Sequence, residues 1–321
     1  MSVYSNNKYD KTRVNDAWYK VVQFIPPKAK VLDIGCSSGQ LGYSLKKEKG
    51  AYVVGLDIDK QDLELAKKNL DKAYLLNVEQ DDLSHLGAFD IIIMADVIEH
   101  LVNPVAALKK VKQLLNENGQ LVFSIPNMAN ITTRLELLKG RFEYKDFGVL
   151  DRTHLRFYDK QEVDRVFREA GLQITQTDCT LREIPENILR QELKSIGISL
   201  TPAFTKFLKN DEALTYQFVG TAVISKSPRP FTIKTTSPLD SVSRYIDSLN
   251  EHHQQKTRDH DNQVQNLQKE IQHLQKELEE HEQHRLTVAR ELDNIRNSRT
   301  WKLVSKIHTV RHKLEATFSK K

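Results

Sequence analysis

Short apolar runs alternate with amphipathic stretches between residues 28 and 125. The runs are rich in β-branched residues, which favour strands, and read VLDIG, AYVVGLDID, AYLLNVE, FDIIIMADVI and GQLVFSIPN. The stretches between them, chiefly residues 40–48, 60–69 and 105–115, have the apolar spacing of helices, and Asn118-Gly119 is expected to end the last one. This alternation predicts a parallel sheet covered by helices on both faces.

The pattern loosens after residue 125. Residues 126–158 are expected to form a long functional connection, followed by a helix over 160–170 that Gly171 ends. LQITQ and residues 216–225 add two strands, separated by a helical insertion over 184–209 that is either a lid or a pair of packing helices. Together these elements predict an α/β domain over residues 1–225 with a seven-stranded, mostly parallel sheet.

Composition changes again beyond residue 225. Residues 226–240 are rich in Pro, Ser and Thr and predict a linker. Residues 241–298 predict a coiled-coil helix, because apolar residues recur at 3-4 spacing, and a single solvated helix is the alternative. The ten expected core positions, two of them polar, are Val264, Leu267, Ile271, Leu274, Leu278, His281, Arg285, Val288, Leu292 and Ile295.

Residues 299–321 form a basic tail, with seven Lys or Arg against one Glu and apolar residues at helical spacing from Trp301 to Phe318. Such a helix suits an anionic membrane surface, with a groove on a partner protein or a longer coiled coil as alternatives. No aromatic-rich binding module accompanies the charge, so nucleic acid is not expected. The chain shows no signal peptide or membrane-spanning run, and its two cysteines are too few for a disulfide framework, so a cytoplasmic location is expected.

The first strand runs into a glycine turn, VLDIGCSSG, of the kind that lets a ligand approach bare backbone. The dinucleotide fingerprint G-x-G-x-x-G is absent because Ser37 stands at its second glycine, which argues against a nicotinamide oxidoreductase. The second strand ends in Asp57, whose carboxylate can accept both hydroxyls of a ribose. A ribose without a diphosphate indicates a nucleoside with a compact polar tail, and S-adenosylmethionine (SAM) has that shape.

The motifs VLDIGCSSG, VVGLDID, FDIIIMADVIEHLVNP and GQLVFSIPN resemble the successive motifs of class I SAM-dependent methyltransferases. NITTRLELLKGRFEYKDFGVLDRTHLRFYDKQEVDRVFREAGL is similar to a bacterial branch associated with cell-surface polysaccharide biosynthesis. The resemblance covers residues 10–225 and implies a Rossmann-like fold with SAM as cofactor.

The resemblance also implies the cofactor site. The glycine turn would surround the methionine part of SAM, Asp57 would bind the ribose, and Ile58 would pack on the adenine. Asn77 stands where the family often has an aspartate, and its amide oxygen can still accept a hydrogen bond from the adenine amino group. The implied cofactor-binding residues are Asp33, Gly35, Cys36, Ser37, Gly39, Asp57, Ile58, Asn77, Val78, Ala95 and Asp96.

Methyl transfer to a hydroxyl requires alignment, desolvation and a base, and two clusters offer one. In the first, Asp96-Val-Ile-Glu-His100, His100 is a candidate base, although Glu99 and His100 could equally cap and brace the turn. In the second, His154 is the favoured base because its pKa lies near neutrality, although this cluster could equally pin its loop to the sheet. The residues of the second cluster are Asp151, Arg152, His154 and Arg156.

Two asparagines and the absence of a metal motif complete the expected site. Asn127 follows the fifth strand and is expected to contact acceptor or cofactor, while Asn130 replaces a histidine of the related branch. No His/Cys/Asp spacing predicts a metal.

The resemblance implies methyl transfer from SAM to a hydroxyl of a cell-surface glycan or its lipid-linked precursor. The alternative is an inactive methyltransferase-like scaffold that organises a glycan-assembly complex through its coiled coil. The expected partners are a glycan or glycolipid acceptor, a second copy of the chain through the coiled coil, and a membrane surface or a glycosyltransferase through residues 299–321. The expected location therefore includes the cytoplasmic face of the membrane.

Overall fold

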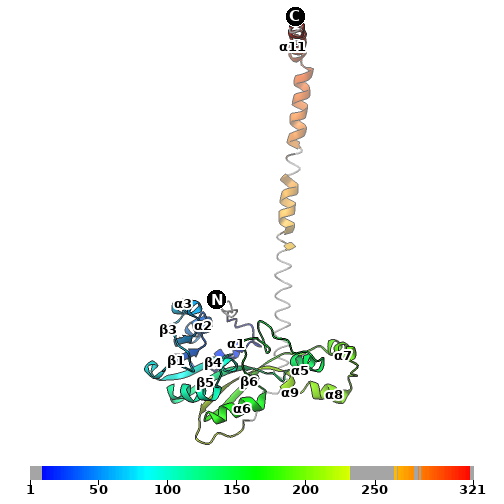
Figure 1. Ribbon diagram of the computed structural model, residues 1–321. Helices are drawn as coiled ribbons and strands as arrows, with labels where there is room; N and C mark the ends of the chain where they lie inside the picture. Colours follow the sequence, from blue (N-terminus) through cyan, green and yellow to red (C-terminus); the bar gives the residue numbers. More distant parts are fainter. Residues whose placement is uncertain (1–8, 232–263, 266, 278–280, 282, 319–321) are drawn as a thin grey trace. The chain divides into compact units, whose positions relative to one another are not determined.

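The computed structural model describes residues 9–231, 264–265, 267–277, 281 and 283–318. Contacts divide the chain into two units, Met1–Leu249 and Asn250–Lys321. Each unit is described by itself below. The first contains every strand of the sheet, and the described part of the second is almost entirely helical (Figure 1).

A seven-stranded sheet in the order β3-β2-β1-β4-β5-β7-β6 forms the centre of the first unit (Figure 1). The first five strands of this order run parallel to one another, and β7 is antiparallel to both of its neighbours. The predicted seven-stranded, mostly parallel sheet is confirmed. The strands are β1 Lys30–Ile34, β2 Tyr52–Asp57, β3 Lys72–Leu75, β4 Phe89–Ala95, β5 Leu115–Pro126, β6 Leu172–Leu181 and β7 Thr215–Ile224.

Alternate residues of the central strands feed two cores on opposite faces of the sheet. Ile91 and Ile93 of β4 join the core that includes helices α1 (Ala17–Phe24), α2 (Gln40–Lys49) and α3 (Lys60–Asn69). Ile92 and Met94 join the other core, with α4 (Pro104–Val111) and α6 (Lys160–Glu169). Both faces of β4 are therefore apolar, as is typical of a parallel strand covered on both sides.

A smaller apolar cluster lies beside the sheet. It joins α5 (Ile131–Leu138) to α7 (Glu186–Ser195), α8 (Pro202–Leu208) and α9 (Asp211–Leu214). The insertion predicted over 184–209 is helical. It packs on α5, which agrees with the expected alternative of a pair of packing helices. Within the long connection predicted over 126–158, helix α5 was not foreseen, because its eight residues are too few to show a clear helical period.

Two further boundaries differ from the sequence prediction. Helix α4 and the short 3-10 helix η4 (Lys112–Leu114) end before Asn118-Gly119, which lies inside β5. A register irregularity in the pairing of β4 with β5 accommodates this early start of the strand. The described part of the predicted linker contacts the domain, because the Phe231 amide donates a hydrogen bond to Asp164 Oδ1 at 3.0 Å. The rest of the linker, residues 232–240, lies outside the described residues.

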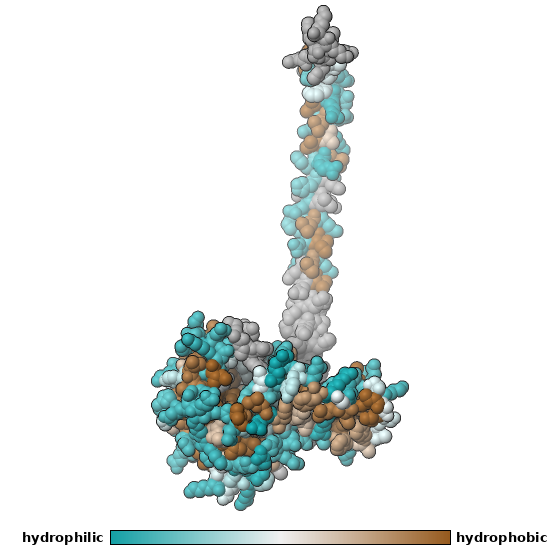
Figure 2. All heavy atoms as spheres, viewed as in Figure 1, coloured by the Kyte–Doolittle hydropathy of each residue, from teal (hydrophilic) through white to brown (hydrophobic). Residues whose placement is uncertain are grey.

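The second unit contains helical segments over 264–265, 267–277 and 283–297 and helix α11 (Arg299–Phe318). Apolar side chains recur along these segments, as Figure 2 shows, and Leu267, Ile271 and Leu274 are all more than half exposed. The helical prediction is confirmed for the described segments, while the coiled coil stays a prediction. Residues 241–263, Leu278 and 319–321 lie outside the described residues. Within the described ranges, no helix is both long enough and apolar enough to cross a membrane.

Two remaining short 3-10 helices flank β4. These are η2 (Ser84–Leu86) before the strand and η3 (Ile98–His100) after it. The second of them carries two of the side chains that form the site described next.

Candidate active site

The carboxyl ends of β1 and β4 meet at the point where the strand order reverses, which is where ligands bind in open α/β sheets. The glycine turn after β1 touches the segment after β4 here. A Cβ on Gly35 would lie 2.6 Å from Val97 Cγ2, so only glycine fits this contact. The predicted cofactor turn and the first predicted catalytic cluster are therefore neighbours in space.

The glycine turn has an unusual backbone. Gly35 and Gly39 have φ of +73° and +77°, and Ser37 between them has φ of +46° although it is not a glycine. Such a φ is rare for residues with a Cβ, and strained backbone of this kind clusters at ligand sites. Ser37 thus adopts a left-handed backbone conformation that usually favours glycine.

Two carboxylates hold Ser37 in place. Its amide donates to Asp57 Oδ2 at 2.6 Å, and its hydroxyl donates to Asp62 Oδ2 at 2.8 Å. Asp57 also accepts the Asp59 amide at 2.8 Å through its other oxygen, which fixes the carboxylate at the end of β2. Each carboxylate oxygen has a second lone pair, so Asp57 can still accept ribose hydroxyls. The buried Asp62, in the first turn of α3, was not predicted from the sequence.

Asp33 is a buried acid just before the turn. It is 2% exposed, and its Oδ2 has no hydrogen-bond partner. Burial, together with the nearby Asp57 carboxylate, raises the pKa of Asp33 to about 7. A cationic ligand group beside Asp33 would stabilise its charged form, which suits the ammonium group of a methionine tail.

Cys36 lies inside the turn as a small buried residue. Burial raises the pKa of its thiol above the usual range, so the thiolate is disfavoured. A Cβ on Gly55 would lie 2.6 Å from the Cys36 sulfur, which shows how closely the turn packs on β2. The structure thus supports a packing role for Cys36 within the predicted cofactor site.

The residues expected to contact adenine lie just beyond the carboxyl ends of β2 and β3. Ile58 is 72% exposed, so an apolar ligand surface packed on it would remove it from water. Val78 is buried, and the Asn77 side-chain oxygen accepts the Glu79 amide at 2.8 Å in a local turn. Because β3 ends at Leu75, Asn77 lies after the strand rather than at its end.

Asp96 follows Ala95 at the carboxyl end of β4 and has φ of +54°. Its Oδ1 accepts the Ser124 hydroxyl at 2.8 Å and the Gln217 amide at 2.9 Å. Burial raises the pKa of Asp96 although both hydrogen bonds act in the opposite direction. Ser124 and Gln217 belong to β5 and β7, and nothing in their sequence surroundings indicated this contact.

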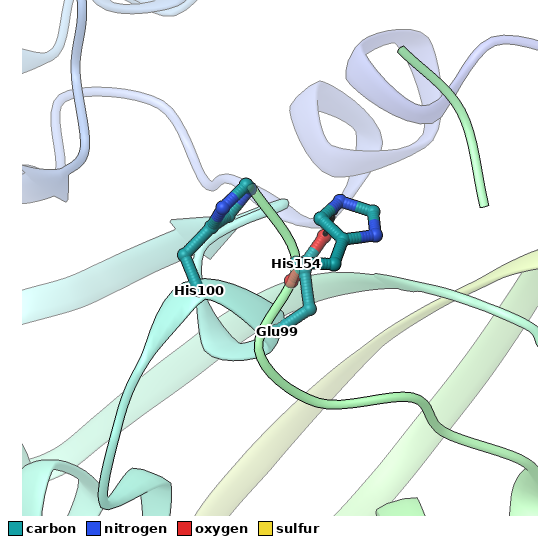
Figure 3. Close-up of side chains that lie close together, drawn as sticks. All are labelled: Glu99, His100 and His154. Carbon is teal, nitrogen blue, oxygen red and sulfur yellow. Dashed lines mark ion pairs between the residues drawn. The ribbon is translucent and has the colours of Figure 1, made fainter. Parts of the chain in front are cut away.

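The two predicted catalytic clusters form one group. The rings of His100 and His154 lie 4.8 Å apart between centroids, and His154 Nε2 lies 3.9 Å from Glu99 Oε1 (Figure 3). Glu99 and His100 lie on η3, and His154 lies on the loop beside it. The potential ligand atoms of the three residues all lie within 4.8 Å of one another.

Burial dominates the electrostatics of this cluster. Glu99 is 1% exposed, neither of its carboxylate oxygens has a hydrogen-bond partner, and burial raises its pKa well above the usual range. Burial also lowers the pKa of His154, which favours the neutral imidazole. The sequence placed Glu99 in the first cluster, either beside His100 or as a brace of the turn. Its closeness to His154 was not predicted, because it arises from tertiary structure.

The comparison with known families supplies the class of the domain. The family model described as "Methyltransferase domain" matches residues 8–177, which is more than half of the chain. The chain belongs to this family. Membership confirms the predicted methyltransferase class and SAM as its cofactor.

Curated relatives of this methyltransferase domain include two enzymes named ubiquinone biosynthesis O-methyltransferase. The one from Aromatoleum aromaticum is 28% identical over 150 residues, which cover 45% of this chain and 64% of the relative. The one from Escherichia fergusonii is 34% identical over 104 residues, which cover 30% of this chain and 43% of the relative. The chain thus spans just under two thirds of the length of the first relative.

Solved structures of similar fold include methyltransferases. Magnesium protoporphyrin IX methyltransferase from Synechocystis PCC 6803, with bound S-adenosylhomocysteine, is 18% identical at a TM-score of 0.44, covering 69% of this chain and 90% of that one. A TehB-like SAM-dependent methyltransferase from Corynebacterium glutamicum is 18% identical at a TM-score of 0.41, covering 65% of this chain and 88% of that one.

The other residues of the second predicted cluster support the loop of the methyltransferase domain. Asp151 Oδ1 accepts the Thr153 amide and hydroxyl at 2.8 and 2.6 Å. Arg156 donates to the Val102 carbonyl at 2.7 Å, and Arg152 forms an exposed ion pair with Asp146 at 2.6 Å. The structure therefore favours the loop-pinning alternative for these three residues and leaves His154 as the chemical candidate.

The two predicted asparagines are also structural. The Asn127 side-chain amide donates to the carbonyls of Glu212 and Thr215, and its oxygen accepts the Ala129 amide. Asn130 caps the start of α5 by accepting the Thr132 amide at 3.1 Å. The expected contact of Asn127 with acceptor or cofactor is at odds with this geometry, because Asn127 is fully buried and both ends of its amide are engaged within the domain.

Proposed function

We propose that this protein transfers the methyl group of SAM to an acceptor hydroxyl. The observation that carries the proposal is the contact between the glycine turn after β1 and the segment that leads to Glu99, His100 and His154. This contact supports placing the cofactor next to a cluster that could act on a hydroxyl. The curated relatives, which are named as O-methyltransferases, support an oxygen acceptor.

The reaction is an in-line displacement at a methyl carbon. The acceptor oxygen forms a bond to the methyl group, the carbon–sulfur bond breaks, and its electron pair stays on sulfur. SAM is already activated as a sulfonium, so the protein supplies alignment, exclusion of water and help with the hydroxyl proton. Asp57 would anchor the ribose and the glycine turn the methionine tail, and the histidine cluster would receive the acceptor.

A cavity of about 480 Å³ lies beside the loop that carries His154. Val149 lines this cavity, and its carbonyl accepts a hydrogen bond from His154 Nδ1 at 3.0 Å. The Arg182 guanidinium stacks over the Tyr216 ring at 3.9 Å in the cavity wall, and Phe147 is 67% exposed there. Aromatic faces next to a cation suit a ring-shaped, polar acceptor.

Two acceptor classes follow from different observations. The resemblance of residues 130–172 to enzymes of polysaccharide biosynthesis favours a cell-surface glycan or its lipid-linked precursor. The names of the curated relatives favour a hydroxylated quinone precursor. We place the glycan first because the aromatic and cationic cavity wall suits a sugar ring that carries several hydroxyls. Labelled SAM incubated with each acceptor class, followed by mapping of the methylated atom, separates the two.

The cofactor half is tested by calorimetry. Asp57→Ala should lose most of the SAM affinity, and NADH should bind neither this variant nor the parent. Asp90→Ala is a matched control, because Asp90 also accepts a backbone amide, from Lys30 at 2.8 Å, at the opposite end of the strands. Equal SAM affinity in the parent and Asp57→Ala would remove the assignment, and no SAM binding by the parent would favour the scaffold alternative.

The transfer half is tested by kinetics at saturating SAM. His154→Ala should lower turnover by roughly 10²–10⁴-fold, as expected when the acceptor hydroxyl is no longer activated, while SAM affinity changes little. An unchanged turnover would restrict His154 to a role in loop support.

A further inference from the structure

Glu99 presents a buried carboxylate that the protein itself does not satisfy. Among the described residues, only Asp33, Glu99 and Tyr158 carry buried side-chain oxygens without a hydrogen-bond partner, and Glu99 is the one with two. Buried carboxylates are normally hydrogen-bonded, paired or bound to a metal. The His154 ring lies beside Glu99, but its Nε2 is 3.9 Å from Oε1, too far for a hydrogen bond, and burial favours the neutral imidazole.

Both histidines of the cluster have the tautomer of metal ligands. His100 Nδ1 lies 3.1 Å from the Thr153 carbonyl, and His154 Nδ1 lies 3.0 Å from the Val149 carbonyl. A carbonyl oxygen only accepts, so each Nδ1 carries a hydrogen, and in the neutral imidazole each Nε2 then presents a lone pair. Histidine ligands are commonly oriented by such a bond from the second ring nitrogen.

The backbone fixes the two segments of the cluster to each other. The amides of Leu155 and Arg156 both donate to the Glu99 carbonyl, at 2.9 and 3.0 Å. The loop that carries His154 is therefore held against η3 at the residue whose carboxylate has no partner. A site built on such linked elements needs little rearrangement to take a ligand.

We propose that Glu99, His100 and His154 bind one divalent first-row transition-metal cation, which in turn binds the acceptor hydroxyl. Two imidazoles and one carboxylate form a ligand set for cations from Mn²⁺ to Zn²⁺. Metal–ligand bonds of about 2.0–2.2 Å place two ligands of one cation about 3–4 Å apart, so the observed span requires a closure of only about 1 Å. Three protein ligands leave coordination positions for the acceptor.

The chemical role of the cation rests on the proposed methyl transfer. An acceptor hydroxyl bound to the cation loses its proton to solvent more readily, because the cation stabilises the oxygen anion. That oxygen then attacks the methyl carbon of SAM, and the carbon–sulfur electron pair remains on sulfur. His154 and Glu99 hold the cation, and neither needs to take the proton.

Metal binding is tested on the full chain, independently of activity. After treatment with a chelator, the parent is titrated with Zn²⁺ by calorimetry and with Co²⁺ by visible absorption. Glu99→Gln and His154→Gln should each bind one equivalent fewer than the parent. His273→Gln is the matched control, because His273 of the second unit is exposed and lies 3.8 Å from Glu277, a pair that could bind metal adventitiously. Its loss should leave the Co²⁺ spectrum of the cluster unchanged.

Circular dichroism and SAM affinity keep the comparison valid, since both should be the same in the parent and in Glu99→Gln. Equal stoichiometry and equal Co²⁺ spectra in parent, Glu99→Gln and His154→Gln would overturn the metal site.

With the site present, chelation should lower transfer by about 10²-fold or more, as for loss of a group that stabilises charge at the reacting oxygen, and Mn²⁺ should restore it. Transfer that resists chelation would overturn the chemical role alone and leave the proposed methyl transfer intact. Metal binding without transfer to any acceptor would instead contradict the proposed function.

Discussion

At the scale of a single residue, the buried acid Asp33 beside the glycine turn makes the free energy of unfolding depend on pH. Asp33 is buried, and its pKa is raised to about 7 by burial and by Asp57. The unfolded chain therefore releases this proton at lower pH than the folded protein does. Between these two values the folded state binds more protons, so the free energy of unfolding falls as pH rises, by about 1.4 kcal/mol for each pH unit.

Asp33→Asn should remove this pH dependence. The variant is expected to gain about 2–3 kcal/mol of stability over the parent between pH 5 and pH 8, because only the parent must keep a charged carboxylate buried at pH 8. For a domain of this size that corresponds to roughly 5–10 °C in the melting temperature. Thermal melts of both proteins without SAM at the two pH values measure the effect. Parallel pH profiles would contradict the prediction.

Sequence and structure agree on some residues of the site and not on others. Gly35, Gly39 and Asp57 could be predicted because each lies at the end of a strand or in the turn that follows one, so local pattern determines its place. Asp62 could not, because the sequence gives no sign that its carboxylate reaches the Ser37 hydroxyl. The pairing of Glu99 with His154 depends on a loop docked by backbone hydrogen bonds, which leave no pattern in side-chain types.

Close packing between elements sets the position of the glycine turn. Gly39 caps the start of α2 with φ of +77°, and a Cβ there would lie 3.1 Å from Ala66 Cα and 3.0 Å from Leu70 Cγ. The first contact is with backbone of α3, which cannot move as a side chain can. Helix α2, helix α3 and the turn can therefore pack this closely only because Gly39 has no Cβ.

Gly39→Ala should accordingly destabilise the protein by about 2–4 kcal/mol, from backbone strain of about 1 kcal/mol and overpacking of about 1–3 kcal/mol. Gly140→Ala is the matched control, since Gly140 has φ of +70° and a Cβ added there would have no atom within 4 Å. The control should show the strain alone. Urea unfolding of both variants gives the difference, and equal midpoints would show that the contact with α3 is absorbed without cost.

Helices and strands were predicted correctly where their apolar spacing repeats often enough to be recognised. The alternating strands and helices of residues 28–125 were found because each buries a face against the same sheet. The exact limits of β5 were not, because Asn118-Gly119 has the composition of a helix stop and yet lies in a strand with an irregular register. Helix α5 was missed because its eight residues give few repeats of the apolar spacing.

At the scale of the whole molecule, the apolar stripe of the second unit has no partner within the described chain. Leu267, Ile271 and Leu274 are exposed by 58%, 54% and 56%. Burying such a side chain contributes about 1.5–3 kcal/mol, so the stripe favours association with a second helix. A second copy of the chain supplies a matching stripe, since both would present the same heptad positions.

The full chain should therefore be an oligomer in light scattering. Ile271→Lys/Leu274→Lys should dissociate it, because both substitutions place charge in the expected core. Gln265→Lys/Gln272→Lys adds the same charge at positions outside the stripe and should remain oligomeric. A parent that is monomeric at micromolar concentration would contradict the prediction.

The same pair of variants tests whether the basic tail acts through that oligomer. Residues 299–321 carry seven Lys or Arg, and Trp301, Val304 and Ile307 of α11 are exposed. Each basic residue near an anionic leaflet contributes about 1 kcal/mol, screened by salt, and joining several tails multiplies their effect. Flotation with anionic vesicles should be strong for the parent and for Gln265→Lys/Gln272→Lys, and it should be weaker for Ile271→Lys/Leu274→Lys although the charge is equal.

Flotation should also fall with added salt and with neutral lipid. Binding that ignores both would assign the tail to a protein partner, such as a glycosyltransferase, because a protein groove recognises the apolar face of the helix rather than the charge of a surface.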